Sequence, residues 1–341
     1  MPDISKINAL DIGSVSKVDG LAKASILDID GVAVPSAFTG LLDTYTGATA
    51  AYSVRQLKTG VTVAMRVRRD TGGGTGDDDE ADIAFDTSLT DPAISLDSAI
   101  SNTTSSAATL GQFLNVGTVN GTTYTNPDSL SGTASCFAGE WKDQSGNANH
   151  ASQATFGSQP QIHDGTVNTD LITENGKPAL KWAAASNQRL DVVALNLSTK
   201  TIALVWYPNN TTSNSRGFTT YAGSGGVGDE ILLDYPTAST AVRYIDGGIL
   251  TTVSFSAAQN LSFAYRNASE IGLGINGGTI STNSTPNSNP NTLDTHIGDE
   301  GGTALEYAIN HQEVVVWNVD QDGAGNRTGI ESNINGFFGI Y

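Results

Sequence analysis

Short apolar runs alternate with turn residues along most of the chain after residue 135. Thr201–Tyr207 is apolar almost throughout, which predicts a strand buried on both faces. Asn175-Gly176 separates two further runs, Leu171-Ile172 and Leu180–Trp182, and predicts a tight hairpin. Turn signals recur about every 8–12 residues, which is typical of an antiparallel β-sandwich.

Two other patterns place elements outside this series. Val61–Arg69 alternates apolar and basic residues and predicts a half-exposed strand, whereas Tyr52–Leu57 and Ala107–Val116 predict short helices. Residues 86–135 are rich in Ser, Thr, Asn and Gly and predict long loops. At the end of the chain a helical period predicts one helix over Asn326–Gly336. We therefore expect a loop-rich leading part, 38–135, and a main sandwich, 136–341.

An 11-residue repeat occupies residues 4–36. Asn8-Ala9, Asp19-Gly20 and Asp30-Gly31 fall at one phase of the repeat and predict tight turns. Each unit is too small to bury its own apolar face, so neighbouring chains would have to stabilise it. We expect residues 1–37 to form a β arm that anchors the protein and promotes homo-oligomers. The aligned apolar positions that mark the arm are Ile4, Ile7, Val15, Val18, Ile26 and Ile29.

A polar turn links two strands between Trp141 and Ile162. Asp143 suits the first position of a type I turn, and Gly146 suits the fourth. His150 follows the turn and can bond back to it, while Trp141 anchors the preceding strand. We interpret this cluster as the structural turn that begins the main sandwich.

Composition and charge exclude several classes of function. The 341 residues carry a net charge of −18, which argues against binding to nucleic acid or to an anionic membrane. The single cysteine, Cys136, allows no intrachain disulfide and is expected to be buried. The N-terminus resembles no signal peptide, and no apolar run reaches the ~18 residues of a membrane span. We expect synthesis in a host cytoplasm, and the four tryptophans to be core residues.

Metal and cofactor sites are not expected, with one alternative. The loop 71–80 contains Asp77, Asp78, Asp79 and Glu80 in succession. Because calcium loops space their ligands, a solvated loop is the first interpretation and a Ca²⁺ site the alternative. The four histidines are too far apart in sequence for a motif of metal ligands.

Two stretches resemble known families. Residues 45–69, 82–85 and 141–150, with Asp143-Gln144-Ser145 and Asn149-His150, resemble the catalytic domain of arabinofuranosidase B-type glycoside hydrolases. From 175–180 to 330–335 the chain resembles the laminin-G/concanavalin-like modules of tailed-bacteriophage virion proteins. Both resemblances imply an all-β, concanavalin/laminin-G-like antiparallel β-sandwich (jelly roll), with the β arm before it and the helix after it.

The resemblance does not extend to a catalytic motif. Retaining hydrolysis needs two carboxyl groups about 5–5.5 Å apart. The nearest candidates, Asp229, Glu230, Asp299 and Glu300, look like loop acids. We therefore expect a non-enzymatic virion structural protein of a tailed phage, as a capsid decoration, a fibre or a tail accessory. Its arm would bind other virion proteins and its lectin-like sandwich would face host glycan. A virion-associated glycoside hydrolase and a secreted adhesin are the alternatives.

Overall fold

The computed structural model describes 38–183, 188–195, 198–209, 215–221, 232–235, 241–246, 249–255, 258–284, 293–298 and 309–341, plus short strands within 1–37. The chain divides into two compact units, Met1–Thr39 and Gly40–Tyr341.

The first unit contains three two-stranded hairpins, one in each repeat. Ile7 pairs with Leu10 in the first, and the other two have the same register. The paired residues flank the positions at which the repeat predicts its turns. Those turn residues, with Ile4, Val15 and Ile26, lie outside the described residues. The hairpin strands are β1 Lys6–Ile7, β2 Leu10–Asp11, β3 Lys17–Val18, β4 Leu21–Ala22, β5 Asp28–Ile29 and β6 Val32–Ala33.

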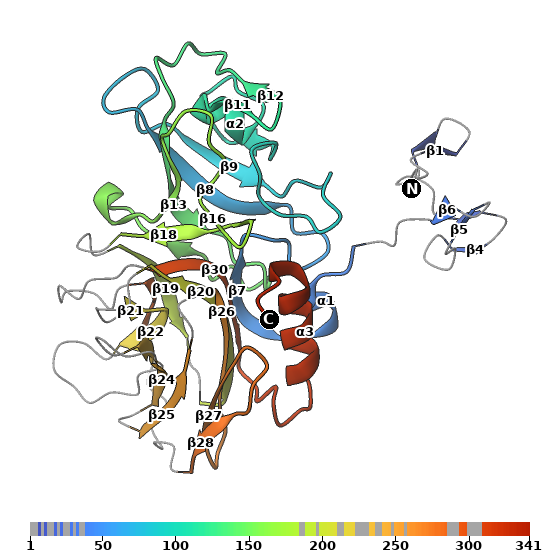
Figure 1. The fold of residues 1–341 in the computed structure, drawn as a ribbon, viewed down its shortest axis with the longest axis vertical. Coiled ribbons are helices and arrows are strands. Elements are labelled where there is room, and N and C mark those ends of the chain that lie inside the picture. The colour runs from blue at the N-terminus through green and yellow to red at the C-terminus, as the bar shows by residue number, and fades with distance from the viewer. Residues whose placement is uncertain are drawn as a thin grey trace. The chain divides into compact units, whose positions relative to one another are not determined.

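The second unit is the expected all-β sandwich (Figure 1). Its described strands form a 16-stranded antiparallel sheet, a four-stranded sheet in the order β21-β23-β24-β25, and two two-stranded sheets, β11-β12 and β16-β17. The early strands are β7 Ala48–Ser53, β8 Val63–Asp70, β9 Glu80–Ala84, β10 Ile100–Ser101, β11 Gly117–Val119, β12 Thr122–Tyr124, β13 Ser135–Trp141, β14 Ala151–Ser152, β15 Gln161–Asp164, β16 Thr173–Glu174, β17 Lys177–Pro178 and β18 Leu180–Trp182. The later strands are β19 Arg189–Leu195, β20 Lys200–Pro208, β21 Ser215–Arg216, β22 Phe218–Tyr221, β23 Leu232–Tyr235, β24 Ala241–Asp246, β25 Ile249–Ser254, β26 Asn260–Arg266, β27 Ile271–Ile275, β28 Ser281–Asn283, β29 Leu293–Gly298 and β30 Ile309–Trp317.

The helices are few and short. α1 Leu41–Thr44 and α2 Leu110–Leu114 lie in the first half, with a 3₁₀ turn at Phe156–Ser158. α3 Arg327–Phe338 confirms the predicted C-terminal helix, and α2 confirms the short helix predicted within 107–116. Across the described part of the chain, no helix is long and apolar enough to cross a membrane.

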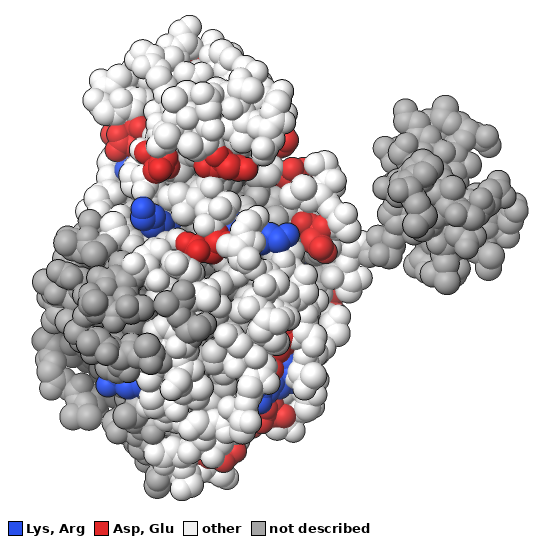
Figure 2. Space-filling model, viewed as in Figure 1, with Lys and Arg blue, Asp and Glu red and all other residues white. Residues whose placement is uncertain are grey.

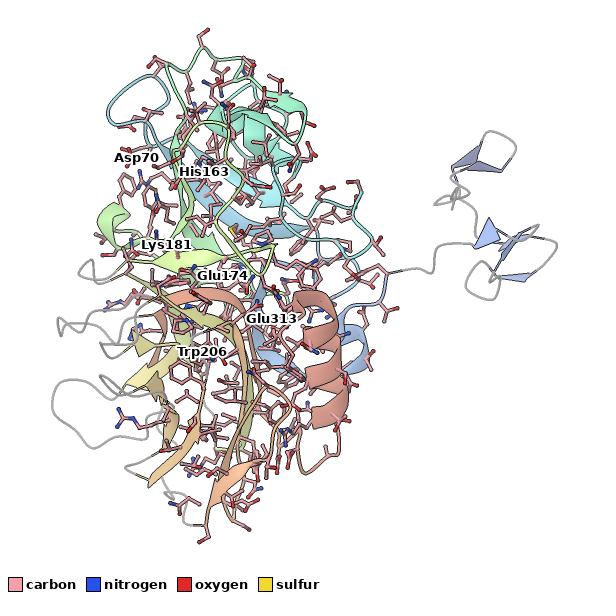
Figure 3. All side chains as sticks on the ribbon, in the orientation of Figure 1. Asp70, His163, Glu174, Lys181, Trp206 and Glu313 are labelled. Carbon is pink, nitrogen blue, oxygen red and sulfur yellow. The ribbon has the colours of Figure 1, made fainter. Side chains whose placement is uncertain are left out.

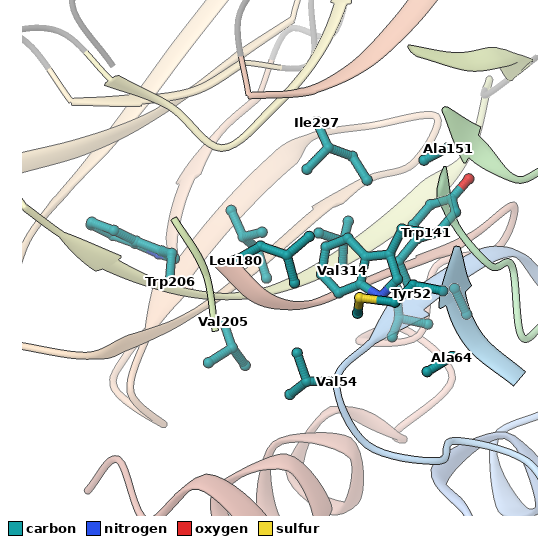
Figure 4. Close-up of a cluster of buried hydrophobic side chains, with 14 of the residues drawn as sticks. Tyr52, Val54, Ala64, Trp141, Ala151, Leu180, Val205, Trp206, Ile297 and Val314 are labelled. Carbon is teal, nitrogen blue, oxygen red and sulfur yellow. The ribbon is translucent and has the colours of Figure 1, made fainter. Parts of the chain in front are cut away.

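The centre of the large sheet is the hydrophobic core. β20 lies between β26 and β30 and is almost completely buried, as its apolar sequence predicts. All four tryptophans are buried, and Trp141 and Trp206 appear among the packed side chains in Figure 4. The indole N–H of Trp141 donates to the Ser53 carbonyl at 3.2 Å. Cys136 is buried as expected, and its burial raises the pKa of the thiol.

Two expectations for the leading part are wrong. Tyr52 and Ser53 belong to strand β7 and not to a helix, because β7 completes the sheet beside β30. β8 is not half-exposed, because Arg68 and Arg69 are buried against aromatic rings and ion-paired with the loop that follows. Sequence periodicity counts arginine as a surface residue, and here aromatic stacking and carboxylates stabilise it inside.

A buried ion pair joins β7, β30 and α3. The Arg55 guanidinium donates to Glu313 through Nε at 2.7 Å and Nη2 at 3.0 Å, and the Ser53 hydroxyl donates to the same carboxylate at 2.7 Å. Arg55 also donates to Asn333 of α3 at 2.9 Å and lies over the ring of Phe337. The pair therefore fixes α3 to the edge of the sandwich.

Candidate functional site

A type I′ hairpin turn positions the candidate site. Asn175 and Gly176 have φ values of 50° and 71°, which the Asn-Gly pair adopts with little strain. This confirms the predicted turn, but its strands are β16 and β17, and Leu180–Trp182 forms β18, which pairs with β15 and β30. The Asn175 amide donates to the carbonyls of Phe338 and Gly339 at 2.7 and 2.8 Å. The hairpin is thus fastened to the end of α3.

Replacing Asn175 tests this fastening. Asn175→Gly keeps the turn and removes two hydrogen bonds, so we expect a loss of about 1–2 kcal/mol in unfolding free energy. Asn175→Ala removes the same two bonds and puts a residue that tolerates the left-handed region less well than Asn at this position, so the loss should rise to about 2–3 kcal/mol. Urea unfolding measures both. A glycine variant as stable as the parent protein would show that the two bonds contribute nothing.

A polar cavity of about 320 Å³ opens beside the hairpin. We call it the Glu174 pocket. It combines a carboxyl group, side-chain amides, a phenol ring and the backbone that follows α3. The described residues that line it are Glu174, Asn175, Tyr207, Ala258, Gln259, Gly339 and Ile340.

Glu174, labelled in Figure 3, is half-buried and lines the pocket. Asn209 donates through its amide to the side-chain oxygen of Asn310 at 2.5 Å, and Asn310 donates in turn to Glu174. Burial raises the pKa of the Glu174 carboxyl, although the bond from Asn310 opposes the rise. A carboxyl group with a raised pKa in a polar cavity can exchange a proton or bind a hydroxyl group.

Gln259 also lines the pocket, and the buried Gln312 accepts a hydrogen bond from it. Gln312 is completely buried, and its amide nitrogen faces the carbonyl oxygens of Glu174, Lys177 and Pro178 at 3.2, 3.0 and 3.0 Å. The side-chain oxygen of Gln312 must therefore face Gln259, whose amide nitrogen donates to it. The side-chain oxygen of Gln259, Oε1, is buried and accepts from no donor among the described residues.

Buried aromatic residues support the same stretch of β30. The His311 ring contacts the edge of Trp182 with a centroid distance of 4.5 Å. Burial lowers the pKa of His311 to about 3, so the imidazole is neutral near pH 7. His311 lies between Asn310 and Gln312 in β30, with its ring packed on Trp182.

A second cavity, of about 400 Å³, lies on the other side of the hairpin. Leu89, Ile94, Pro178 and Phe337 give it apolar walls. The Lys177 ammonium lies 4.2 Å from the centre of the Phe337 ring. This cavity therefore contains the cation of the hairpin, whereas the Glu174 pocket contains its carboxylate.

The acidic loop is held by arginines of β8. Arg66 pairs with Glu80 at 2.8 Å, Arg68 with Asp78 at 2.7 Å and Arg69 with Asp79 at 2.5 Å. Asp77 accepts instead from Thr71, and those bonds lower the pKa of its carboxyl. Figure 2 shows several Asp and Glu side chains, with Lys and Arg side chains nearby, in the upper half of this view. Within the described residues, no group of three or more His, Cys, Asp or Glu side chains is arranged to hold a metal ion.

The polar turn that resembles the arabinofuranosidase signature is a dense hydrogen-bond network. Asp143 accepts from the backbone N–H groups of Ala51, Ser145 and Asn149 at 2.8, 2.9 and 3.0 Å. His150 accepts from the Asp143 N–H at 3.0 Å, and Gly146 has a φ of 95°. These contacts join the turn to β7, next to Trp141 at the end of β13.

The predicted acids and the observed pocket are different residues. Asp229, Glu230, Asp299 and Glu300 lie outside the described residues. The sequence reasoning missed Glu174, Gln259 and the polar residues of β30. Two signals pointed to them: an acid directly before the Asn-Gly turn, and the polar run 310–313 inside an otherwise apolar strand.

Comparisons with known proteins support the fold. Neither a scan against protein-family models nor a search of the curated proteins finds a match. Among solved structures, the chain is similar to an arabinofuranosidase complexed with arabinofuranosyl-α-1,2-xylobiose, with a TM-score of 0.53 and 18% identity over 87% of this chain and 64% of that one. It is also similar to a GH54 α-L-arabinofuranosidase soaked with a cyclic sulfate inhibitor, with a TM-score of 0.55 and 15% identity over 86% and 63%.

These similarities contradict the expectation of a non-enzymatic protein and confirm the expected fold. The expectation of a non-enzymatic protein is wrong, because the matched structures are glycoside hydrolases. The chain spans less than two thirds of each enzyme, and at this identity the likeness establishes the fold. The resemblance to the arabinofuranosidase fold is confirmed.

Proposed function

We propose that this protein is a carbohydrate-active β-sandwich that binds a glycan in the Glu174 pocket. The pocket itself carries the proposal, because it places a carboxyl group, amide groups and the Tyr207 ring around one cavity. Sugar hydroxyl groups both donate and accept, and carboxylates and amides match them. An aromatic ring offers an apolar face for the C–H groups of a sugar. The shared fold with arabinofuranosidases supports the same class of ligand.

Calorimetric titration tests this proposal. The probes are arabinofuranosyl-α-1,2-xylobiose and arabinoxylan fragments, which present the sugars of the ligand bound in the similar structure. Glu174→Ala should weaken binding about 10- to 100-fold, because a bond to a charged group contributes about 1.5–3 kcal/mol. The matched control, Asp170→Ala, removes a carboxylate from the second cavity and should leave affinity unchanged. No heat with any probe, or equal effects of the two variants, would contradict the proposal.

Hydrolysis is a second candidate, favoured by the raised pKa of Glu174. A carboxyl group that stays protonated to higher pH suits a general acid that donates to the leaving oxygen. Glu174→Gln should then keep glycan binding and abolish release of reducing sugar. Release at the parent rate by this variant would exclude Glu174 as the acid.

For the N-terminal arm we propose attachment to a larger assembly, of which a phage particle is one. Three repeated hairpins in a unit separate from the sandwich support this role. Deleting residues 1–37 should leave the unfolding midpoint of the sandwich unchanged and reduce the oligomeric state seen by sedimentation. A truncated protein with the oligomeric state of the full chain would contradict the role of the arm in self-association.

A further inference from the structure

The described lining of the Glu174 pocket carries negative charge and no positive charge. Among its described lining residues Glu174 is charged, and none is Lys or Arg. Of the described cations, Lys177 stacks on Phe337 in the second cavity, and Arg55 is paired with Glu313. The protein as a whole carries a net charge of −18, which disfavours the approach of an anion.

The hydrogen-bond network also leaves an acceptor, and not a donor, unpaired at Gln259. Three backbone carbonyls fix the orientation of Gln312, and Gln312 fixes Gln259. Gln259 therefore cannot exchange its donor and acceptor ends without losing this chain of bonds. Its buried Oε1 is an acceptor that lacks a donor among the described residues, and Glu174 supplies further acceptor oxygens. Glu174 and Gln259 thus present acceptors, and hydroxyl groups are the matching donors.

We propose that the pocket selects uncharged glycans, whose hydroxyl groups donate to Glu174 and Gln259, and rejects glycans that carry a carboxylate there. This selectivity rests on the proposed function, since it concerns the same pocket. A ligand carboxylate would face Glu174 without a counter-charge, and it would bring acceptors to a wall that needs donors. Both effects weaken the binding of a carboxylated glycan. The charge effect comes from Glu174, which we assign as the residue that determines specificity.

A matched pair of ligands tests the selectivity. Arabinofuranosyl-α-1,2-xylobiose has its one primary hydroxyl group at C5 of the arabinose, and oxidising that group gives the same trisaccharide with one carboxylate. Titrated into the full chain at low salt, the neutral form should bind at least about tenfold tighter, which is about 1.4 kcal/mol. Glu174→Gln removes the negative charge and should bring the ratio of the two affinities towards one. Asp170→Asn, in the second cavity, should leave the ratio unchanged.

The outcomes distinguish glycan binding in the Glu174 pocket from its selectivity for uncharged glycans. If the carboxylated trisaccharide binds as tightly as the neutral one, the selectivity is wrong and glycan binding stands. If Glu174→Gln leaves the tenfold ratio intact, Glu174 is not its source and the assignment fails. If neither ligand binds the parent protein, both the proposed function and the selectivity are overturned.

Discussion

Glu313→Ala should lower the unfolding free energy by about 3–5 kcal/mol, because it leaves the Arg55 guanidinium buried without a counter-charge. Glu313 is completely buried and accepts three hydrogen bonds, two from Arg55 and one from Ser53. The contacts of Arg55 with α3 depend on the same pair. Guanidinium-induced unfolding, followed by tryptophan fluorescence, measures the loss.

The double variant Arg55→Met with Glu313→Leu is the control. It removes both charges and fills the space with apolar atoms, so it should be more stable than Glu313→Ala alone. If the double variant is less stable than the single one, the contacts of Arg55 with Asn333 and Phe337 of α3 contribute more free energy than the unpaired buried charge costs.

Asp143→Ala should also cost about 3–5 kcal/mol. The carboxylate accepts from three backbone N–H groups and from the Ser145 hydroxyl at 2.7 Å. The Ala51 N–H is buried, and an unpaired buried donor costs about 1–3 kcal/mol. The turn also fastens β13 to β7, so its loss weakens the contact between two parts of the large sheet. Thermal unfolding followed by circular dichroism measures the effect.

Asp164→Ala is the matched control for this turn. Asp164 is an exposed carboxylate at the end of β15, and it accepts from the Thr166 N–H at 2.9 Å. Its removal should cost less than about 1 kcal/mol, as surface substitutions usually do. Equal losses for Asp143→Ala and Asp164→Ala would contradict a structural role specific to the Asp143 turn.

The fold could be predicted where local chemistry decides it. The Asn175-Gly176 turn requires two positive φ values that this pair supplies, and β20 is apolar on both faces because it lies at the centre of the sheet. β7 could not be predicted in this way. Tyr52 to Leu57 has helical spacing, and the pairing with β30, more than 250 residues away, decides its conformation.

The candidate site was harder to predict than the fold. Glu174, Tyr207 and Gln259 are far apart in sequence and line one pocket, and Asn310, near the start of β30, donates to Glu174. No spacing rule connects them. The sequence drew attention instead to Asp143 and His150, whose polar groups satisfy the backbone of a turn. A polar cluster in sequence indicates hydrogen bonding, and the structure decides whether the partner is the chain itself or a ligand.

A crystal structure of the full chain with arabinofuranosyl-α-1,2-xylobiose tests the central claim most directly. The account predicts electron density for a sugar in the Glu174 pocket, with one hydroxyl group within hydrogen-bond distance of the Glu174 carboxyl and another within reach of Gln259 Oε1. Density for the sugar at another site, with the Glu174 pocket unchanged, would contradict it.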